Sequence, residues 1–302
     1  MTDLRVWDDA DVTAALPMAT AIDAIRAALV DGLDPTSDPA RSIVPTGHGN
    51  VLLMPAEWGG YAGVKIVTVA PDNPAAGLPL VQGNYLLLDG RTLTPLLLTA
   101  AEALTAIRTS AVSAVAADVL SIEGATTLVV FGSGPQARQH VAALRVIRPI
   151  GDVIVVGRDQ GRAAAFAQEC GGRVGTPDDV ASADIVACCT SSRTPVFDGT
   201  LLRPHATVIA VGSYQPDTAE VDARTVAACA VVVEERATAL REAGDVVQAV
   251  RSALLDPAAL TELPALVRGT ERIEPDRPRL FKSVGMAWED LVLVAAAHRR
   301  RN

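Results

Sequence analysis

The sequence predicts a two-domain α/β protein in which one domain contains a doubly wound, mostly parallel sheet. The chain has 302 residues, which is long enough for two domains. Between residues 41 and 99, short apolar runs are separated by Gly, Pro and Asn, as in antiparallel strands. From residue 125 onward, apolar strands alternate with helical stretches, a rhythm typical of a parallel sheet.

The N-terminal third begins with a predicted helix at residues 17–33, where apolar residues recur at helical spacing after a proline. The strand-like runs that follow lie at residues 41–46, 50–58, 61–70, 81–89 and 92–99. Asp89-Gly90 is expected to form the turn of a hairpin between the last two. We expect an antiparallel sheet or a partly closed barrel, followed by one long alanine-rich helix over residues 100–121.

The middle of the chain carries the parallel-sheet pattern. "ATTLVVFGSGPQARQHVAALRVI" and "GDVIVVGRDQGRAAAFAQEC" each predict a strand, a turn and a helix. "ADIVACCTSS", "ATVIAVGSYQ" and "AACAVVVEE" predict three further short strands. The charged, proline-rich segment at residues 269–280 is interpreted as the exit from this domain. A final helix follows in "MAWEDLVLVAAAHR", and the pattern alone leaves its placement open.

Composition excludes several classes of function. The net charge of -9 argues against nucleic acid as the main partner, because phosphate binding requires a basic surface. The N-terminus does not resemble a signal peptide, and no run of 18 apolar residues predicts a membrane span. The four cysteines lack C-x-x-C spacing and the four histidines lack metal-ligand spacing. We therefore expect a cytoplasmic protein without a bound metal.

Lysine is rare in this chain and occurs where arginine would not serve. Lys65 and Lys282 are the only lysines among 26 basic residues, and both lie among apolar residues. A lysine ammonium is compact, and its pKa shifts when it is desolvated, whereas an arginine stays charged. The position of Lys65, at the centre of the strand-like "YAGVKIVTVA", therefore suggests a chemical role. A strand lysine that extends to water is the alternative.

The segment "VVFGSGPQA" predicts a dinucleotide site. Gly132, Gly134 and Ala137 fit G-x-G-x-x-A directly after an apolar strand and at the start of a helix. The first glycine permits the tight turn, the second lets a pyrophosphate approach, and the small third residue lets the helix pack on the strand. The helix N-terminus then offers N–H groups to the phosphate oxygens.

The end of the second strand indicates which dinucleotide is preferred. Proteins that bind NAD usually place an acidic residue there for the ribose 2′-hydroxyl. Gly157 stands at that position and Arg158 follows, and an arginine suits a 2′-phosphate. We therefore predict NADP(H), with NAD(H) still possible because Asp159 comes next.

The chain resembles the ornithine cyclodeaminase and mu-crystallin family. The matching segments, from about residue 41 to 291, are "LLMPA", "GVKIVTVAPDNPAAGLPLVQG", "LTAIRTSA", "VVFGSGPQARQH" and "LFKSVGMAWEDL". The resemblance implies an NAD(P)-binding Rossmann domain at residues 116–282. It also implies a substrate and dimerisation domain built from residues 1–115 and 283–302, and a homodimer.

The resemblance also implies roles for individual residues. Arg41, Lys65 and Arg108 would converge on a substrate α-carboxylate, and Lys65 would be a proton donor. Each of these cations is unfavourable when the site is empty. Burial and the neighbouring positive charges should therefore lower the pKa of Lys65. Leu52, Met54 and Tyr214 are assigned to the substrate site. The cofactor site is assigned Gly132, Gly134, Pro135, Gln136, Ala137, Arg158, Thr109, Thr190, Gly212 and Lys282.

Two departures from the family pattern indicate the substrate. Ornithine cyclodeaminases, as the resemblance implies, use two acidic residues where this chain has Leu52 and Tyr214. Neither residue can pair with a distal ammonium, so ornithine is a poor fit. We predict an NAD(P)-dependent oxidoreductase acting on C–N bonds, specifically a reductase of cyclic imino acids such as pyrroline- or piperideine-2-carboxylate. Ornithine cyclodeaminase, an amino-acid dehydrogenase and an NADPH-loaded binding protein remain as alternatives.

Overall fold

The computed structural model describes residues 4–274 and 276–301, and its α/β architecture confirms the predicted fold class. The chain divides into two compact units, one of residues 1–108 with 286–302 and one of residues 109–285. The C-terminal helix α10 (Ala287–Arg301) therefore clusters with the N-terminal part of the chain. Helix α3 (Glu102–Leu120) continues across the first division.

The first unit is built on a twisted sheet with the strand order β1-β6-β5-β4-β3-β2 in the described part of the chain. The pairings from β2 to β6 are antiparallel, and only the edge strand β1 runs parallel to its neighbour β6 among the described residues. Among the described residues the sheet is open, so the antiparallel sheet of the prediction is confirmed and the partly closed barrel is not. Its strands are β1 (Arg5–Trp7), β2 (Ser42–Thr46), β3 (Gly49–Trp58), β4 (Tyr61–Val69), β5 (Val81–Asp89) and β6 (Pro95–Ala100).

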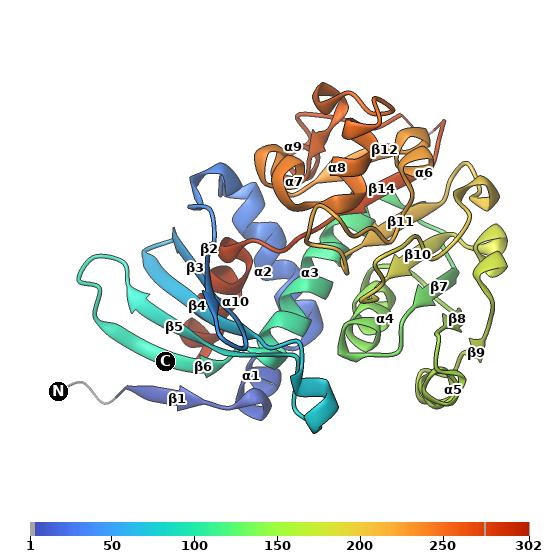
Figure 1. The fold of residues 1–302 in the computed structure, drawn as a ribbon. Helices are drawn as coiled ribbons and strands as arrows, with labels where there is room; N and C mark the ends of the chain where they lie inside the picture. The colour runs from blue at the N-terminus through green and yellow to red at the C-terminus, as the bar shows by residue number, and fades with distance from the viewer. Residues whose placement is uncertain (1–3, 275, 302) are drawn as a thin grey trace. The chain divides into compact units, whose positions relative to one another are not determined.

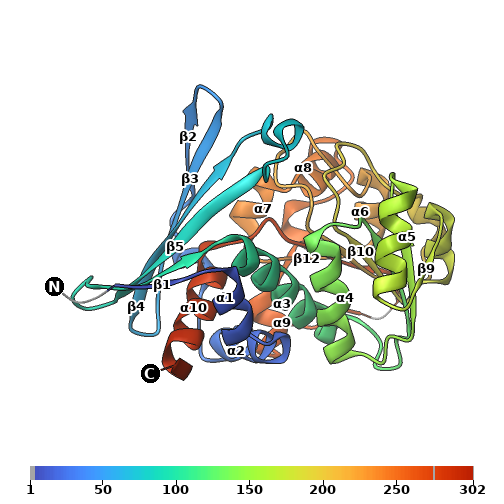
Figure 2. The same cartoon turned by 90° about the horizontal axis from the view of Figure 1, so that it is seen from below.

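Three helices cover one face of this sheet. Helix α10 contacts β3 and β4, and α1 (Asp9–Ala15) and α2 (Met18–Val30) pack against α10 (Figure 2). The burial of β4 alternates because successive side chains point to opposite faces of the sheet. Lys65 points to the covered face, whereas its neighbour Ile66 is exposed.

The second unit contains a doubly wound sheet with the order β13-β12-β14-β11-β10-β7-β8-β9 in the described part of the chain (Figure 1). Every described pairing in this sheet is parallel. Its strands are β7 (Thr127–Phe131), β8 (Asp152–Val156), β9 (Arg173–Val174), β10 (Ile185–Cys188), β11 (Thr207–Ala210), β12 (Ala230–Val233), β13 (Thr261–Glu262) and β14 (Arg279–Lys282). Its helices, besides α3, are α4 (Pro135–Ile147), α5 (Gln160–Glu169), α6 (Ala223–Ala228), α7 (Arg236–Glu242), α8 (Gly244–Arg251) and α9 (Leu263–Val267).

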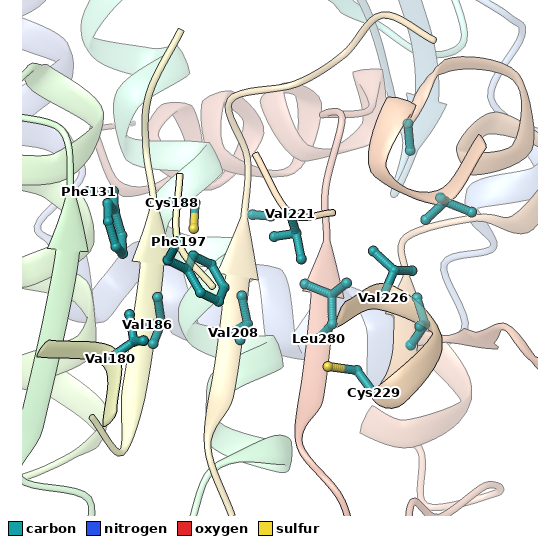
Figure 3. Packing of buried hydrophobic residues seen from close by; sticks show 14 of the residues in the cluster. Phe131, Val180, Val186, Cys188, Phe197, Val208, Val221, Val226, Cys229 and Leu280 are labelled. Carbon is teal, nitrogen blue, oxygen red and sulfur yellow. The ribbon is translucent and has the colours of Figure 1, made fainter. Parts of the chain in front are cut away.

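The core on one face of this sheet is aliphatic, as expected for a chain with 3% aromatic residues. Figure 3 shows Val186, Val208 and Leu280 side by side on β10, β11 and β14. Phe131 and Phe197 stack within this layer with their ring centroids 5.6 Å apart. Strands buried on both faces are continuous apolar runs, which is why the sequence marked them clearly.

The sequence did not predict the short strands β1, β9 and β13, and it did not predict β14. The charge and proline content of residues 269–280 predict an exit from the domain, but Arg279–Lys282 form β14, which lies between β11 and β12. All four of its residues are buried. The pattern did not reveal this strand because an arginine and a lysine stand at its ends.

By length and hydropathy alone, α3 could cross a membrane, and the bent pair α1 and α2 passes the same criterion. However, 78% of the most apolar 18-residue stretch of α3 is buried inside the structure, as in the core helix of a soluble protein. These helices are therefore weak grounds for a membrane span.

Candidate functional site

Lys65 lies in the middle of a sheet rather than at a strand end. It occupies the centre of β4, where Met54 of β3 and Tyr85 of β5 are its cross-strand partners. Only 2% of Lys65 is exposed, so the side chain does not extend to water. The glycine two residues earlier, Gly63, leaves room for Tyr85, because a Cβ there would lie 2.3 Å from the Tyr85 hydroxyl.

Two acidic residues of α10 pair with the predicted substrate-binding cations. Lys65 Nζ donates to Asp290 Oδ1 at 3.1 Å and to Oδ2 at 3.3 Å. Arg108 Nη1 donates to Glu289 Oε2 at 2.7 Å, and Arg108 Nε lies 3.8 Å from Asp290 Oδ1. Glu289 Oε1 also accepts from the backbone N–H of Met286. The structure therefore brings Lys65 and Arg108 together, each with a carboxylate partner, where the sequence suggested uncompensated cations.

The electrostatics of this cluster are dominated by burial. Burial lowers the pKa of Lys65 to about 8, while Asp290 opposes the shift and Arg108 adds to it. Burial likewise raises the pKa of Asp38 to about 7, although the Trp288 N–H, which donates to its Oδ2 at 2.7 Å, opposes the shift. Burial raises the pKa of the Tyr85 hydroxyl, and Asp290 and Asp38 add to that effect. Two groups with pKa values near neutrality thus belong to one unit.

The other predicted substrate residues lie as follows. Leu52 is buried on β3, two positions before Met54, so both side chains lie on the same face of the sheet. Arg41 directly precedes β2 and is half-buried. Tyr214 belongs to the second unit, follows β11, and is 40% exposed.

The predicted pyrophosphate turn joins β7 to α4. Gly132 has φ of +108°, and a Cβ there would lie 2.5 Å from the Cys189 carbonyl oxygen, so only glycine fits. Gly134 is the N-cap of α4, no side chain of the described residues forms a capping hydrogen bond to this helix, and a Cβ at Gly134 would meet nothing within 4 Å. An uncapped helix N-terminus with open space before it fits a dinucleotide phosphate. Pro135, Gln136 and Ala137 form the first turn of this helix.

The turn after β8 bears on the choice of cofactor. Arg158 is exposed in this turn, and Arg162 is exposed in the first turn of α5. The Asp159 carboxylate accepts from the Arg162 backbone N–H at 3.0 Å and caps α5. The acidic residue that argued for NAD(H) is therefore already engaged as a helix cap.

Three predicted cofactor residues are joined by two buried acids. Glu220 accepts from the backbone N–H and the hydroxyl of Thr190, both at 2.7 Å, and from the Gly212 N–H at 2.6 Å. Asp245 accepts from the backbone N–H of Glu220 at 2.8 Å and forms an ion pair with Lys282 at 2.9 Å. Burial raises the pKa of Glu220, and Lys282 opposes this. This network fixes the loops at the carboxyl ends of β10, β11 and β14, where open α/β sheets bind ligands.

This network of hydrogen bonds and one ion pair limits the roles that Lys282 and Gly212 can take. Lys282 is 1% exposed and paired, so it supports the loops rather than extending into solvent. A Cβ at Gly212 would lie 1.9 Å from the Thr190 carbonyl oxygen, which explains the glycine. Thr109 is buried in the part of α3 that belongs to this unit. No cluster of three or more His, Cys, Asp or Glu that could hold a metal ion is found in residues 4–274 and 276–301.

The sequence did not reveal Asp38, Tyr85, Glu220, Asp245, Glu289 and Asp290. One signal was available, because Glu289 and Asp290 are adjacent acids in the otherwise apolar stretch "MAWEDLVLV". Acidic residues are almost never fully buried unless they are paired, so their position required partners.

The glycine turn, the uncapped helix and the parallel sheet define a dinucleotide-binding protein of the Rossmann class. The chain belongs to the ornithine cyclodeaminase/mu-crystallin family, whose model matches residues 4–301. It is 34% identical over 281 residues to a Delta(1)-pyrroline-2-carboxylate reductase of Bacillus cereus, covering 88% of this chain and 86% of the relative. It is 33% identical over 308 residues to the Delta(1)-pyrroline-2-carboxylate/Delta(1)-piperideine-2-carboxylate reductase of Azospirillum brasilense, covering 98% and 96%.

A solved structure is similar over the whole length of the chain. It is the Delta(1)-pyrroline-2-carboxylate reductase of Thermococcus litoralis in complex with NADH and L-proline, which superimposes with a TM-score of 0.91 at 27% identity. The match covers 98% of this chain and 97% of that one.

Proposed function

We propose that this protein is an NAD(P)H-dependent reductase of cyclic imino acids such as Δ1-pyrroline-2-carboxylate and Δ1-piperideine-2-carboxylate. The observation that carries the proposal is the near full-length similarity to reductases of these two compounds. The chain's own residues agree, because its predicted substrate site combines cations for a carboxylate with apolar side chains for a ring.

The cations recognise the substrate carboxylate. Lys65 and Arg108 are held together by the acids of α10, and Arg41 joins them in the proposal. Charge-assisted hydrogen bonds to a carboxylate are about twice as strong as neutral ones. They also orient the planar imino acid, since the carboxylate is attached to the carbon that is reduced.

Leu52 and Met54 favour an uncharged substrate tail. Both are at least nine-tenths buried on β3, with Met54 beside Lys65 in the sheet. An ammonium placed against them without a carboxylate partner would cost several kcal/mol. A pyrroline or piperideine ring carries no such charge away from its imine nitrogen.

Lys65 is proposed to supply the proton. A nicotinamide in its reduced form provides the hydride that the C=N carbon accepts. As the C=N double bond becomes single, the nitrogen takes a proton from the Lys65 ammonium, and the product is the cyclic amino acid. A donor with a pKa of about 8 is suited to this step near neutral pH, because it is charged before transfer yet releases its proton readily.

NADP(H) is the proposed preferred cofactor. The support is local: Arg158 and Arg162 are exposed after β8, and the Asp159 carboxylate is used as a helix cap. An arginine on this turn and another in the first turn of α5 suit a 2′-phosphate. The Thermococcus litoralis enzyme was solved with NADH, so the preference should be measured as kcat/KM for both cofactors.

A cytoplasmic homodimer is the proposed assembly. The face of the first sheet opposite Lys65 exposes Ile66, and the edge strand β2 exposes Ile43 and Val44. Exposed apolar side chains gathered on one sheet are typical of an association surface. Light scattering on the purified protein would give about twice the 31.3 kDa chain mass if the proposal holds.

The deciding experiment follows NADPH consumption with each cyclic imine, beside ammonia release from L-ornithine with NAD⁺. Loss of NADPH with a cyclic imine and no ammonia supports the reductase. Ammonia release would instead establish a cyclodeaminase and show that Leu52 does not exclude ornithine. NADPH loss only with a keto acid and an amine would identify an amino-acid dehydrogenase, and tight NADPH binding without turnover would identify a binding protein.

A further inference from the structure

We propose that Asp290 is a positioning residue of the imine-reducing site, which fixes the Lys65 side chain and keeps it charged, while Glu289 holds Arg108 beside it. This inference rests on the proposed function, because it assigns Asp290 a task in the same reaction. The two acids act through the cations and need not touch the substrate.

The geometry gives each acid a separate partner. Asp290 accepts from Lys65 with both carboxylate oxygens, at 3.1 and 3.3 Å. Glu289 accepts from Arg108 with one oxygen and from the Met286 N–H with the other, so its orientation is fixed at two points. The side chains of both acids are 0% exposed, and water cannot replace either partnership. Adjacent residues of one helix thus hold two cations that come from β4 and α3.

Charge balance explains why the acids are needed. The groups that influence Lys65 are Asp290 and Glu289 from α10 and Arg108 from α3. Tyr85 is its neighbour on β5, and Asp38 acts on the same carboxylates. Burial and Arg108 both favour an uncharged Lys65, whereas the acids favour the ammonium, with Asp290 the stronger of the two. Without Asp290, the remaining groups would favour an uncharged lysine, which can neither attract a carboxylate nor donate the proton.

The scarcity of lysine makes a direct test possible. Protein labelled with ¹³C at lysine Cε gives resonances from only Lys65 and Lys282, and Lys65→Met assigns them by removing one. The ¹³C chemical shift of Cε reports whether the neighbouring Nζ is protonated. The pH at which half of Lys65 is protonated, its titration midpoint, is read from this shift. In Asp290→Asn, which keeps the size of the side chain, we expect the titration midpoint of Lys65 to fall by about 1 to 3 pH units. The Lys282 resonance should not move, because the partner of Lys282 is Asp245 and not Asp290.

Glu289→Gln is the matched control, since it neutralises the adjacent, equally buried acid. It should shift the Lys65 midpoint less than Asp290→Asn does, because Glu289 pairs with Arg108 instead. Asp290→Glu restores the negative charge and should return the titration midpoint of Lys65 most of the way to its wild-type value. An unchanged Lys65 midpoint in folded Asp290→Asn, or a larger shift in Glu289→Gln, would overturn the proposal.

Kinetics connect the titration to the reaction. In Asp290→Asn, the alkaline limb of kcat/KM for the cyclic imine should move to lower pH together with the Lys65 midpoint. If the wild type reduces no imine, the proposed function fails, yet the NMR titration still decides the relation between Asp290 and Lys65. If Asp290→Asn does not fold, the wild type remains informative. A midpoint near 8 requires a counter-charge, whereas a midpoint of about 6 or below, as for buried lysines without one, contradicts the proposal.

Discussion

Replacing Lys282 by methionine should destabilise the second unit severely. Methionine fills a similar volume but leaves the Asp245 carboxylate buried without a cation. At the observed 2.9 Å separation, the Coulomb attraction is about 6 kcal/mol for an effective dielectric constant of about 20. Desolvation offsets part of this, and removing one partner of a buried pair usually costs about 3–5 kcal/mol. Since domains are stable by only about 5–15 kcal/mol, this is a large fraction of the total.

A double-mutant cycle separates the ion pair from other effects. Asp245→Asn keeps an oxygen for the Glu220 and Val221 N–H groups, both of which donate to Asp245 Oδ1 at 2.8 Å. The double variant buries no charge at this position, so it should be more stable than Lys282→Met alone. Urea unfolding followed by circular dichroism gives the free energies, and we expect a coupling of about 2–3 kcal/mol.

The same variants should weaken cofactor binding, because Asp245 supports Glu220, which in turn fixes Thr190 and Gly212. The dissociation constant for NADPH, measured by fluorescence on folded protein, should rise in Lys282→Met. A loss of less than about 1 kcal/mol in Lys282→Met, or strict additivity in the cycle, would refute the view that this ion pair supports the loops.

Three further predictions concern single residues. Lys65→Met should lower kcat for the cyclic imine by about 100-fold or more, as expected when a proton donor is removed, and near-normal activity in the NADPH assay would exclude Lys65 from the mechanism. Arg158→Ala should raise KM for NADPH by about tenfold or more and leave KM for NADH nearly unchanged, because only NADPH has a 2′-phosphate; equal effects on both would contradict the assignment. The pKa of Asp38 is raised from 3.8 to about 7, so its protonated form stabilises the folded state at low pH, and this contribution is lost as the pH rises to about 7. The unfolding free energy of the wild type should therefore fall relative to Asp38→Asn across that range, and a constant difference in urea titrations would show that Asp38 titrates normally.

Local signals made much of this protein predictable. The strands of the second unit are continuous apolar runs, and the turn at Gly132 and Gly134 has the spacing that a pyrophosphate requires. Lys65 could be singled out from the sequence because a charged residue is unusual in the middle of an apolar, strand-like run. Each of these features is contained in fewer than about 25 consecutive residues, within reach of pattern reasoning.

The partners of the charged residues were beyond such reasoning. Lys65 and Asp290 are 225 positions apart in the chain. The alternation of apolar and polar side chains along β4 does not indicate which helix covers its buried face. Likewise, β14 occupies the middle of the second sheet although its sequence has cations at both ends.

The sequence by itself determined most strands of the two sheets, several of the helices, the dinucleotide turn and the identity of the two unusual lysines. Tertiary structure alone decided that each lysine is buried against an aspartate, Lys65 with Asp290 and Lys282 with Asp245. The physical reason is that secondary structure and turns depend on neighbouring residues, whereas the charge state of a buried group depends on whatever the fold places within a few ångströms of it.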